Sequence, residues 1–505
     1  MPLLLSANEK GTAEPRFWVW LIPALLGALV FLQTLGGSAI YDDSMVFKND
    51  DRLRDVAAWG RYWTEAYHDG PDNLYRPLGS MTFAAVWWLF GDAWLPQHAV
   101  NVALHGICAA LTALLALRML GNVHLATIAG IAFALHPIHV EPVAMLVGRF
   151  ELLCTAATLA GLGLLVTDKT IGYGRALAVF ACFVIAMLSK EQGLIFPLLA
   201  GVVAVTCRPI RRPGYGAALL IALIGIGLAT MVVVREQVLD LKFWWDRNFL
   251  DPNVQPLILA EGGDRWLMPL ELIGRYAWLL IWPNPLSIDY GGRVIGHEWS
   301  ATSPYFWLGT GLLLAWFVGI AATVIKRRWV LLALLLLVAL SYGPASNIAS
   351  LIGTIFGERL LYMPSAFFAI LLAMVVVKLP RKALVVPVVV ALAWAGQTLR
   401  YADRWTEPYT YYQQAVIDQP LGMRLHMLLA QEHQARGKFD EARASATAGR
   451  EADPASHLAW RWSAILALER GELEVAERFA LEANRRFPNS GGGVLEAIHE
   501  KRSAE

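Results

Sequence analysis

The stretch FWVWLIPALLGALVFLQTLGGSAIYDD, residues 17–43, decides the class of fold to which this chain belongs. Residues 17–40 contain no charged side chain. About 20 apolar residues, rising 1.5 Å each in a helix, are enough to cross the roughly 30 Å hydrocarbon core of a bilayer. The run is long for a signal peptide and lacks a small-residue cleavage site, so we expect an uncleaved membrane span.

Two adjacent carboxylates, Asp42 and Asp43, follow this span directly. Lys10 and Arg16 precede it, so the positive-inside rule places the N-terminus in the cytoplasm and the acidic pair at the external surface. Carboxylates are costly beside hydrocarbon and are commonly functional there. The pair therefore indicates chemistry on a substrate that is itself linked to lipid.

The composition is that of a membrane protein with many spans, because 56% of the residues are apolar and only 16% are charged. Roughly eleven spans are predicted, at 17–40, 98–118, 124–136, 150–167, 176–188, 193–206, 216–234, 305–325, 329–345, 360–377 and 383–399. The four cysteines show no metal-like spacing and are interpreted as packing residues.

Basic residues test this topology, because cytoplasmic connections are enriched in Lys and Arg. With eleven spans, every basic cluster faces the cytoplasm: Arg118, Lys169 and Arg175, then Arg208, Arg211 and Arg212, then Lys326, Arg327 and Arg328, then Lys378, Arg381 and Lys382. If the apolar segment 267–282 crossed the membrane, the 326–328 cluster would lie outside. We therefore expect an interfacial or re-entrant helix there, with Glu271 and Arg275 paired one turn apart.

Four segments then meet on the external face: a catalytic loop at 41–97 and the stretches 136–149, 189–192 and 346–359. The segment between 246 and 289 is also external. Its charged residues are Asp246, Arg247, Asp264, Arg265 and Asp289. They either bind an acceptor substrate or a lipid headgroup, or they belong to a solvated loop.

The chain divides into a transmembrane domain, 1–400, and a soluble helical domain, 401–505. In the second part charged residues become more frequent and long apolar runs are absent. The same residue types also recur 34 positions apart: Gly437 and Gly471, Ala442 and Ala476, and Pro420, Pro454 and Pro488. A period of 34 is typical of tetratricopeptide repeats. The odd number of spans places these repeats outside the cytoplasm.

Local motifs follow one another in the order YDD (41–43), YRPL (75–78), HPIHVE (136–141), GRFELL (148–153), KEQG (190–193) and GERLLYMPS (357–365). With the many spans and the repeats, this set resembles the transmembrane and tetratricopeptide-repeat containing O-mannosyltransferases, which belong to the GT-C class of glycosyltransferases. The resemblance implies an all-α polytopic GT-C fold. The repeat array is shorter than in animal relatives, which favours a bacterial inner-membrane protein with its active site and repeats in the periplasm.

The resemblance also implies the reaction, which is transfer of a hexose, expected to be mannose, from a polyprenyl phosphate to Ser or Thr hydroxyls of an exported protein. In an inverting transfer a carboxylate takes the hydroxyl proton while the lipid phosphate departs. Asp42 is the first choice for this base and Asp43 orients it or binds the acceptor, but the sequence leaves their assignment open.

A departing phosphate needs cations, and Arg149, Lys190 and Arg359 are the candidates. Further residues are expected to bind substrate or orient these groups, namely Arg76, His136, His139, Glu141, Glu191, Glu358 and Tyr362. The His136, His139 and Glu141 cluster has metal-ligand chemistry, but Pro137 and Pro142 interrupt the helix that a zinc site of this kind would need. We expect no metal and no cofactor apart from the lipid-linked sugar.

The expected partners are the lipid bilayer, the polyprenyl-phosphate sugar and an acceptor protein, with no nucleic acid. The repeats bind the acceptor or a recruiting factor, or they only pack on the catalytic loops. An envelope glycan or lipid as acceptor is the alternative within the enzyme class. A transporter is disfavoured because polar residues gather at one face instead of midway through the spans, and a non-catalytic scaffold is disfavoured by the ordered ionisable motifs.

Overall fold

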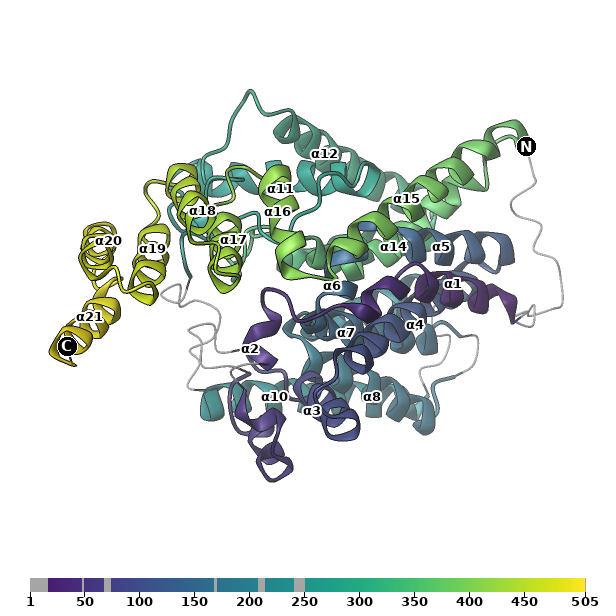
Figure 1. Ribbon diagram of the computed structural model, residues 1–505. Coiled ribbons are helices and arrows are strands. Elements are labelled where there is room, and N and C mark those ends of the chain that lie inside the picture. The colour runs from purple at the N-terminus through teal and green to yellow at the C-terminus, as the bar shows by residue number, and fades with distance from the viewer. Residues whose placement is uncertain are drawn as a thin grey trace.

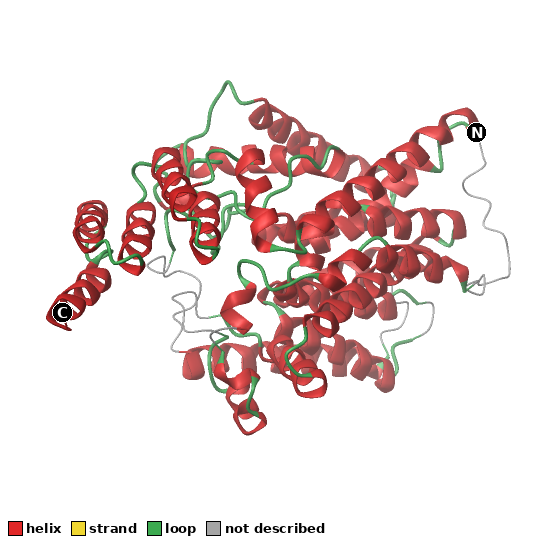
Figure 2. Ribbon diagram, in the orientation of Figure 1, coloured by secondary structure: helices red, strands yellow, loops and turns green. Residues whose placement is uncertain are grey.

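The computed structural model describes residues 17–47, 50–67, 74–167, 170–207, 214–239 and 250–504. Within these ranges the secondary structure is helical throughout, without strands (Figure 2), which confirms the all-α prediction. Several charged residues named above lie outside the described ranges: Lys10, Arg16, Lys169, Arg208, Arg211, Arg212, Asp246 and Arg247.

The apolar helices form one bundle in which α1 (Trp18–Leu29), α4 (Trp94–Leu120) and α5 (Val123–Leu135) pack side by side (Figure 1). The other long helices are α3 (Pro77–Phe90), α7 (Arg149–Leu165), α8 (Tyr173–Ser189), α9 (Phe196–Thr206), α10 (Tyr215–Leu239), α11 (Asp264–Ile281), α12 (Pro304–Ile325), α13 (Trp329–Tyr342), α14 (Tyr362–Val376) and α15 (Val385–Arg404).

In the described part of the chain, six helices are long and apolar enough to cross a membrane, or seven if the bent pair at 123–135 and 137–144 is one span. Five further apolar helices have between 10 and 17 residues. These helices indicate an integral membrane protein, whereas the count of eleven spans stays a prediction. The first predicted span is shorter in the structure, because α1 ends at Leu29 and a 3-10 turn covers Leu32–Gly36.

The predicted interfacial segment forms α11, which is not among the candidate spans. The expected pair is present, with Arg275 Nη2 2.7 Å from Glu271 Oε1. Helix α11 packs closely on α12 because two glycines lie at the crossing. A Cβ atom added at Gly274 would lie 1.9 Å from the carbonyl oxygen of Tyr305, and one added at Gly309 would lie 1.8 Å from that of Leu270.

The C-terminal part contains α16 (Pro408–Asp418), α17 (Met423–Ala435), α18 (Phe439–Ala452), α19 (His457–Glu469), α20 (Leu473–Arg486) and α21 (Gly492–Ala504). The 34-residue spacing corresponds to two hairpins, α17 with α18 and α19 with α20. Gly437 and Gly471 stand at the two turns with φ of 72° and 78°, in the left-handed region that favours glycine. Ala442 and Ala476 are fully buried at the helix crossings.

The two hairpins differ in their relation to the bundle. Tyr411, Tyr412 and Ala415 of α16 and Leu425 and Leu429 of α17 belong to the same hydrophobic core as the bundle. Helices α19, α20 and α21 project away from it, at the left of Figure 1, and these three helices share a small core of their own. The packing therefore crosses the predicted domain boundary at residue 400.

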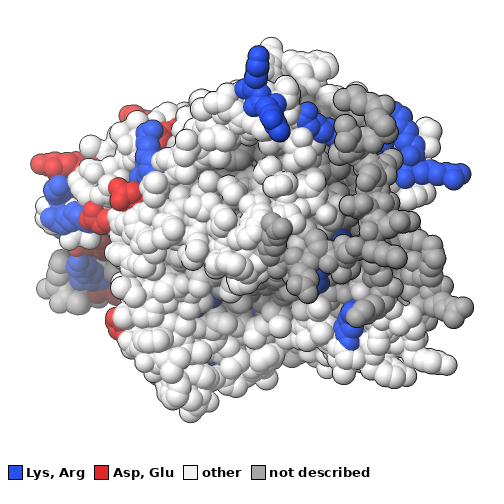
Figure 3. All heavy atoms as spheres, turned by 90° about the vertical axis from the view of Figure 1, so that its right-hand side faces the viewer, with Lys and Arg blue, Asp and Glu red and all other residues white. Residues whose placement is uncertain are grey.

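Figure 3 shows the end of the bundle that is at the right in Figure 1, where α15 begins. On this face Lys and Arg are visible at the top and at the right, whereas Asp and Glu are visible only along the left margin. Exposed basic residues also occupy the turns before α13 and α15. This distribution agrees with a cytoplasmic location for those turns, although the orientation of the chain stays a prediction.

Candidate active site

The centre of the candidate site is an ion pair between Asp42 and Arg359, residues 317 positions apart. Arg359 lies in the 3-10 turn Glu358–Leu361 at the start of α14, and its Nη1 is 3.1 Å from Asp42 Oδ2. The two side chains are 23% and 25% exposed. Among the described residues, Asp42 forms an ion pair with Arg359 alone. Because a quarter of its side chain is exposed, the carboxylate is accessible to a substrate.

Glu141 completes this cluster from the short helix α6 (Val140–Ala144). Its Oε1 lies 3.2 Å from Arg359 Nη1, and its Oε2 accepts the backbone N–H of Arg359 at 2.8 Å. Glu141 is almost completely buried. One guanidinium therefore joins two carboxylates that come from the first loop and from the segment after α5. Charge-assisted hydrogen bonds of this kind are among the stronger ones in proteins.

Asp43 has a different environment although it is the next residue. It is completely buried, its Oδ2 accepts the N–H of Ile40 at 3.1 Å, and its Oδ1 accepts the N–H of Val147 at 2.9 Å. Burial raises the pKa of Asp43 to about 7, against the opposing effect of these N–H groups. Asp43 thus ties the first loop to the segment before α7, and Asp42 alone of the pair reaches the accessible cluster.

Arg149 lies beneath that segment and not in the accessible cluster. It is completely buried, its Nε donates to Asn101 Oδ1 at 2.9 Å, and its Nη2 donates to the carbonyl oxygen of Gln97 at 2.6 Å. Asn101 in turn donates to the carbonyl oxygens of Met145 and Leu146. These contacts support the backbone that holds Asp43, and a role for Arg149 in binding donor phosphate stays a prediction.

Two further ion pairs join the YRPL, GRFELL and KEQG motifs. Arg76 binds Glu191 through Nη2 at 2.8 Å and Nε at 3.1 Å, and Lys190 binds Glu151. Burial lowers the pKa of Lys190, and the adjacent Glu151 opposes this shift. The Lys190 charge also interacts with that of Arg359, which places the two groups of ion pairs in one electrostatic neighbourhood.

Arg235, at the end of α10, was not predicted from the sequence. It is 6% exposed, and its Nε and Nη1 have no hydrogen-bond partner in the described part of the chain. Its charge interacts with those of Glu191 and Arg76. The sequence feature that could have indicated Arg235 is its position directly after the predicted span 216–234, because an arginine is costly in hydrocarbon.

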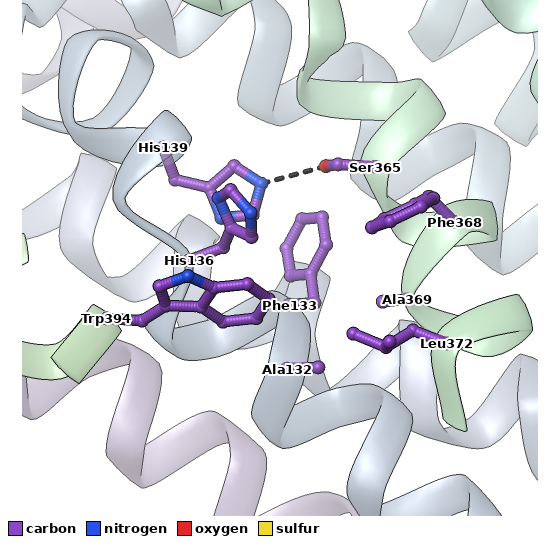
Figure 4. Close-up of a pocket in the computed structure, with 9 residues that line it drawn as sticks. All are labelled: Ala132, Phe133, His136, His139, Ser365, Phe368, Ala369, Leu372 and Trp394. Atoms are coloured by element: carbon purple, nitrogen blue, oxygen red, sulfur yellow. Dashed lines mark hydrogen bonds between the residues drawn. The ribbon is translucent and has the colours of Figure 1, made fainter. Parts of the chain in front are cut away.

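The two histidines lie deeper, around a small cavity between α5, α14 and α15. In Figure 4 both rings face the space lined by Phe133, Ser365 and Trp394. His139 Nε2 lies 2.8 Å from Ser365 Oγ (Figure 4). The nitrogens of His136 meet backbone groups, because Nδ1 accepts the N–H of Ile138 at 3.1 Å and Nε2 lies 3.0 Å from the carbonyl oxygen of Leu280.

The remaining predicted residues, Glu358 and Tyr362, contact different partners. Glu358 accepts the backbone N–H of Ser287 at 2.9 Å and the hydroxyl of Tyr290. The Tyr362 hydroxyl lies 2.8 Å from Nδ1 of His105. Among the described residues, no group of three His, Cys, Asp or Glu side chains is arranged to hold a metal ion. The structure thus brings Asp42, Glu141 and Arg359 together and leaves the histidines and Tyr362 in the helix core.

Comparison with known proteins finds relatives that are protein O-mannosyl-transferases. The protein O-mannosyl-transferase F38B6.6 of Caenorhabditis elegans is 28% identical over 447 residues, which cover 83% of this chain and 60% of the relative. The chain is similar to protein O-mannosyl-transferases. Human protein O-mannosyl-transferase TMTC4 is 26% identical over 82% of this chain and 63% of its own length. The chain therefore spans about three fifths of these O-mannosyl-transferases, and no family model matches it.

Two solved structures align over most of the chain at low identity. ArnT from Cupriavidus metallidurans bound to undecaprenyl phosphate is 13% identical, with a TM-score of 0.43 and coverage of 86% of this chain and 76% of that one. The Archaeoglobus fulgidus oligosaccharyltransferase in the apo form is 15% identical, with a TM-score of 0.41 and coverage of 82% and 60%. The superpositions are loose, and nothing about the site follows from them.

Proposed function

We propose that this chain is a membrane glycosyltransferase of the GT-C class that transfers a hexose, with mannose as the expected sugar, from a polyprenyl phosphate to Ser or Thr hydroxyls of an exported protein. The observation that carries the proposal is the accessible Asp42, Arg359 and Glu141 cluster in a chain similar to protein O-mannosyl-transferases. The site is proposed to face the periplasm of a bacterial inner membrane.

Asp42 is the proposed base. Its carboxylate takes the proton of the acceptor hydroxyl while that oxygen attacks the anomeric carbon from the side opposite the phosphate. The bond between this carbon and the phosphate oxygen breaks, and its electron pair leaves with the phosphate. The products are an O-glycosylated protein of inverted anomeric configuration, polyprenyl phosphate, and a proton held by Asp42.

Cations near the site stabilise the departing phosphate. Arg359 has two carboxylate partners but is still 23% exposed, so its planar fork can also meet phosphate oxygens. Lys190 and Arg76 add charge nearby, each already paired with a glutamate. Among the residues that the structure describes, Nε and Nη1 of Arg235 have no hydrogen-bond partner, and the Arg235 charge interacts with those of Arg76 and Glu191. Arg235 is therefore a further candidate for holding the donor phosphate.

The first prediction concerns Asp42. Membranes that contain the protein are incubated with polyprenyl phosphate carrying radiolabelled mannose, and label in protein is counted for the unaltered chain, Asp42→Asn and Asp92→Asn. We expect Asp42→Asn to lower transfer by about 10² to 10⁴-fold, since it removes a general base with little change in volume. Asp92 is an exposed residue of the same external loop, so Asp92→Asn should transfer normally.

Two other outcomes would change the proposal. Transfer that survives in Asp42→Asn would exclude Asp42 as the base. Label that enters glycolipid or envelope glycan but no protein would replace the protein acceptor with the glycan alternative.

A further inference from the structure

Arg424, the second residue of α17, reaches from the first repeat hairpin into the candidate site. The carbon at the centre of its guanidinium lies 5.0 Å from the ring centroid of Tyr41, the residue before Asp42. Its Nη1 lies 3.5 Å from Oδ1 of Asp289. The Arg424 side chain is 17% exposed. A cation over an aromatic face is attracted by the ring quadrupole, more strongly where water is excluded.

The elements that carry Arg424 are firmly seated. Tyr411 of α16 accepts the backbone N–H of Ile288 through its hydroxyl at 3.0 Å, and both Tyr411 and Tyr412 are buried. Leu425, the neighbour of Arg424, lies in the bundle core. Figure 1 shows α16 and α17 near the bundle, whereas α19 to α21 extend away. The contact between Arg424 and Tyr41 is therefore part of a packed interface.

Tyr41 has a backbone conformation that depends on its surroundings. Its φ is 59°, in the left-handed region that is uncommon for residues other than glycine. Such conformations persist where neighbouring structure holds them, and they concentrate at functional sites. Here the turn lets two consecutive residues diverge, with Asp42 directed to Arg359 and Asp43 directed to the N–H of Val147.

We propose that Arg424 is a positioning residue for Asp42. By holding the Tyr41 ring beneath its guanidinium, Arg424 maintains the left-handed turn that presents the Asp42 carboxylate to Arg359. The first repeat hairpin then completes the active site, in addition to any binding of acceptor by the outer repeats. The catalytic part of this inference rests on the proposed glycosyl transfer, whereas the contact and its effect on the turn do not.

The kinetic test compares Arg424→Ala with Arg424→Lys and with Arg443→Ala. Arg443 is an exposed arginine of the same hairpin that pairs with Glu472, away from the site. We expect Arg424→Ala to lower kcat by roughly tenfold to a hundredfold, as misplacing a catalytic group does, with little change in the KM for donor. Arg424→Lys should restore part of kcat because it keeps a cation over the ring, and Arg443→Ala should match the unaltered chain.

A double substitution shows whether Arg424 acts through Tyr41. Tyr41→Leu removes the aromatic face and should lower kcat to a similar degree. Combining it with Arg424→Ala should cost little more than either change alone, because residues that act as one unit are not additive. If the two losses multiply, Arg424 acts independently of Tyr41 and the inference is overturned. Should Arg424→Ala fail to fold, Arg424→Lys and Tyr41→Leu carry the comparison.

A readout without activity separates the inference from the proposed function. The N–H groups of Asp43 and Ser44 bind the carbonyl oxygens of Ile40 and Tyr41 at 3.2 Å, so their hydrogen exchange reports the turn. Exchange should accelerate in Arg424→Ala and not in Arg443→Ala. If it does so in a chain that transfers no mannose, the positioning role stands and the proposed function fails. Unchanged exchange, with a raised KM as the main kinetic effect, would mean that Arg424 contacts substrate and would overturn the positioning role.

Discussion

At the scale of single residues, the site depends on how differently the chain treats two neighbouring aspartates. Asp42 and Asp43 have the same chemistry, but the positive φ of Tyr41 sends one to an accessible arginine and the other into the core. Asp43 is completely buried, and its two oxygens accept the backbone N–H groups of Ile40 and Val147. Its part in the proposed reaction is therefore to hold the loop on which Asp42 stands.

This assignment predicts a pH dependence of stability. Asp43 has a pKa of about 7 in the folded chain and about 3.9 when unfolded, so the folded state binds more protons between these values. The contribution of Asp43 to the free energy of unfolding should be fully present below about pH 4, fall as the pH rises to about 7, and then level off. The contribution lost over this range corresponds to roughly 4 kcal/mol.

Thermal unfolding in detergent at pH values from 5 to 8 measures this dependence. Asp43→Asn should flatten the decline, whereas Asp92→Asn, at an exposed position, should retain it. A decline of equal slope in Asp43→Asn would mean that another group titrates.

At the scale of elements, interrupted helices place the catalytic groups. The prolines at 137 and 142 were expected to interrupt a helix. The chain bends by 53° between 123–135 and 137–144, and Pro137 begins the second segment, whereas Pro142 lies within α6. The short helix α6 that follows the bend carries Glu141, and a 3-10 turn before α14 carries Arg359. A straight helix at either point would carry these side chains along its own axis instead of bringing them to a common centre.

The α11 and α12 crossing allows a test of element packing. Gly274→Ala would bring a methyl group to within 1.9 Å of the Tyr305 carbonyl oxygen, so the helices must separate. We expect a loss of about 1 to 3 kcal/mol, as for other overpacked sites. Gly311 of α12 has no atom within 4 Å of the added Cβ, so Gly311→Ala should be neutral or up to about 1 kcal/mol stabilising. Equal unfolding midpoints for the two variants would contradict the close crossing.

At the scale of the whole molecule, basic turns and the repeat hairpins should lie on opposite sides of the membrane. Single cysteines can test this once the four native cysteines are replaced by serine, because two of those are buried and two are only partly accessible. Lys382 and Arg485 are exposed positions in a basic turn and in the repeats. A membrane-impermeant maleimide applied from outside should label Arg485→Cys, and Lys382→Cys only after the membrane is opened. The reverse pattern would invert the topology.

The helical class, the membrane character and the 34-residue hairpins were determined by local pattern, because apolar runs and repeated Gly and Ala positions need only neighbouring residues to be recognised. The ordered motifs also indicated Asp42, Glu141 and Arg359 as site residues. Tertiary structure alone decided which of two adjacent aspartates is accessible, that Arg149 is buried, and that Arg424 approaches Tyr41. Those outcomes depend on burial and on contacts between segments hundreds of residues apart, and neither quantity is encoded in the local sequence.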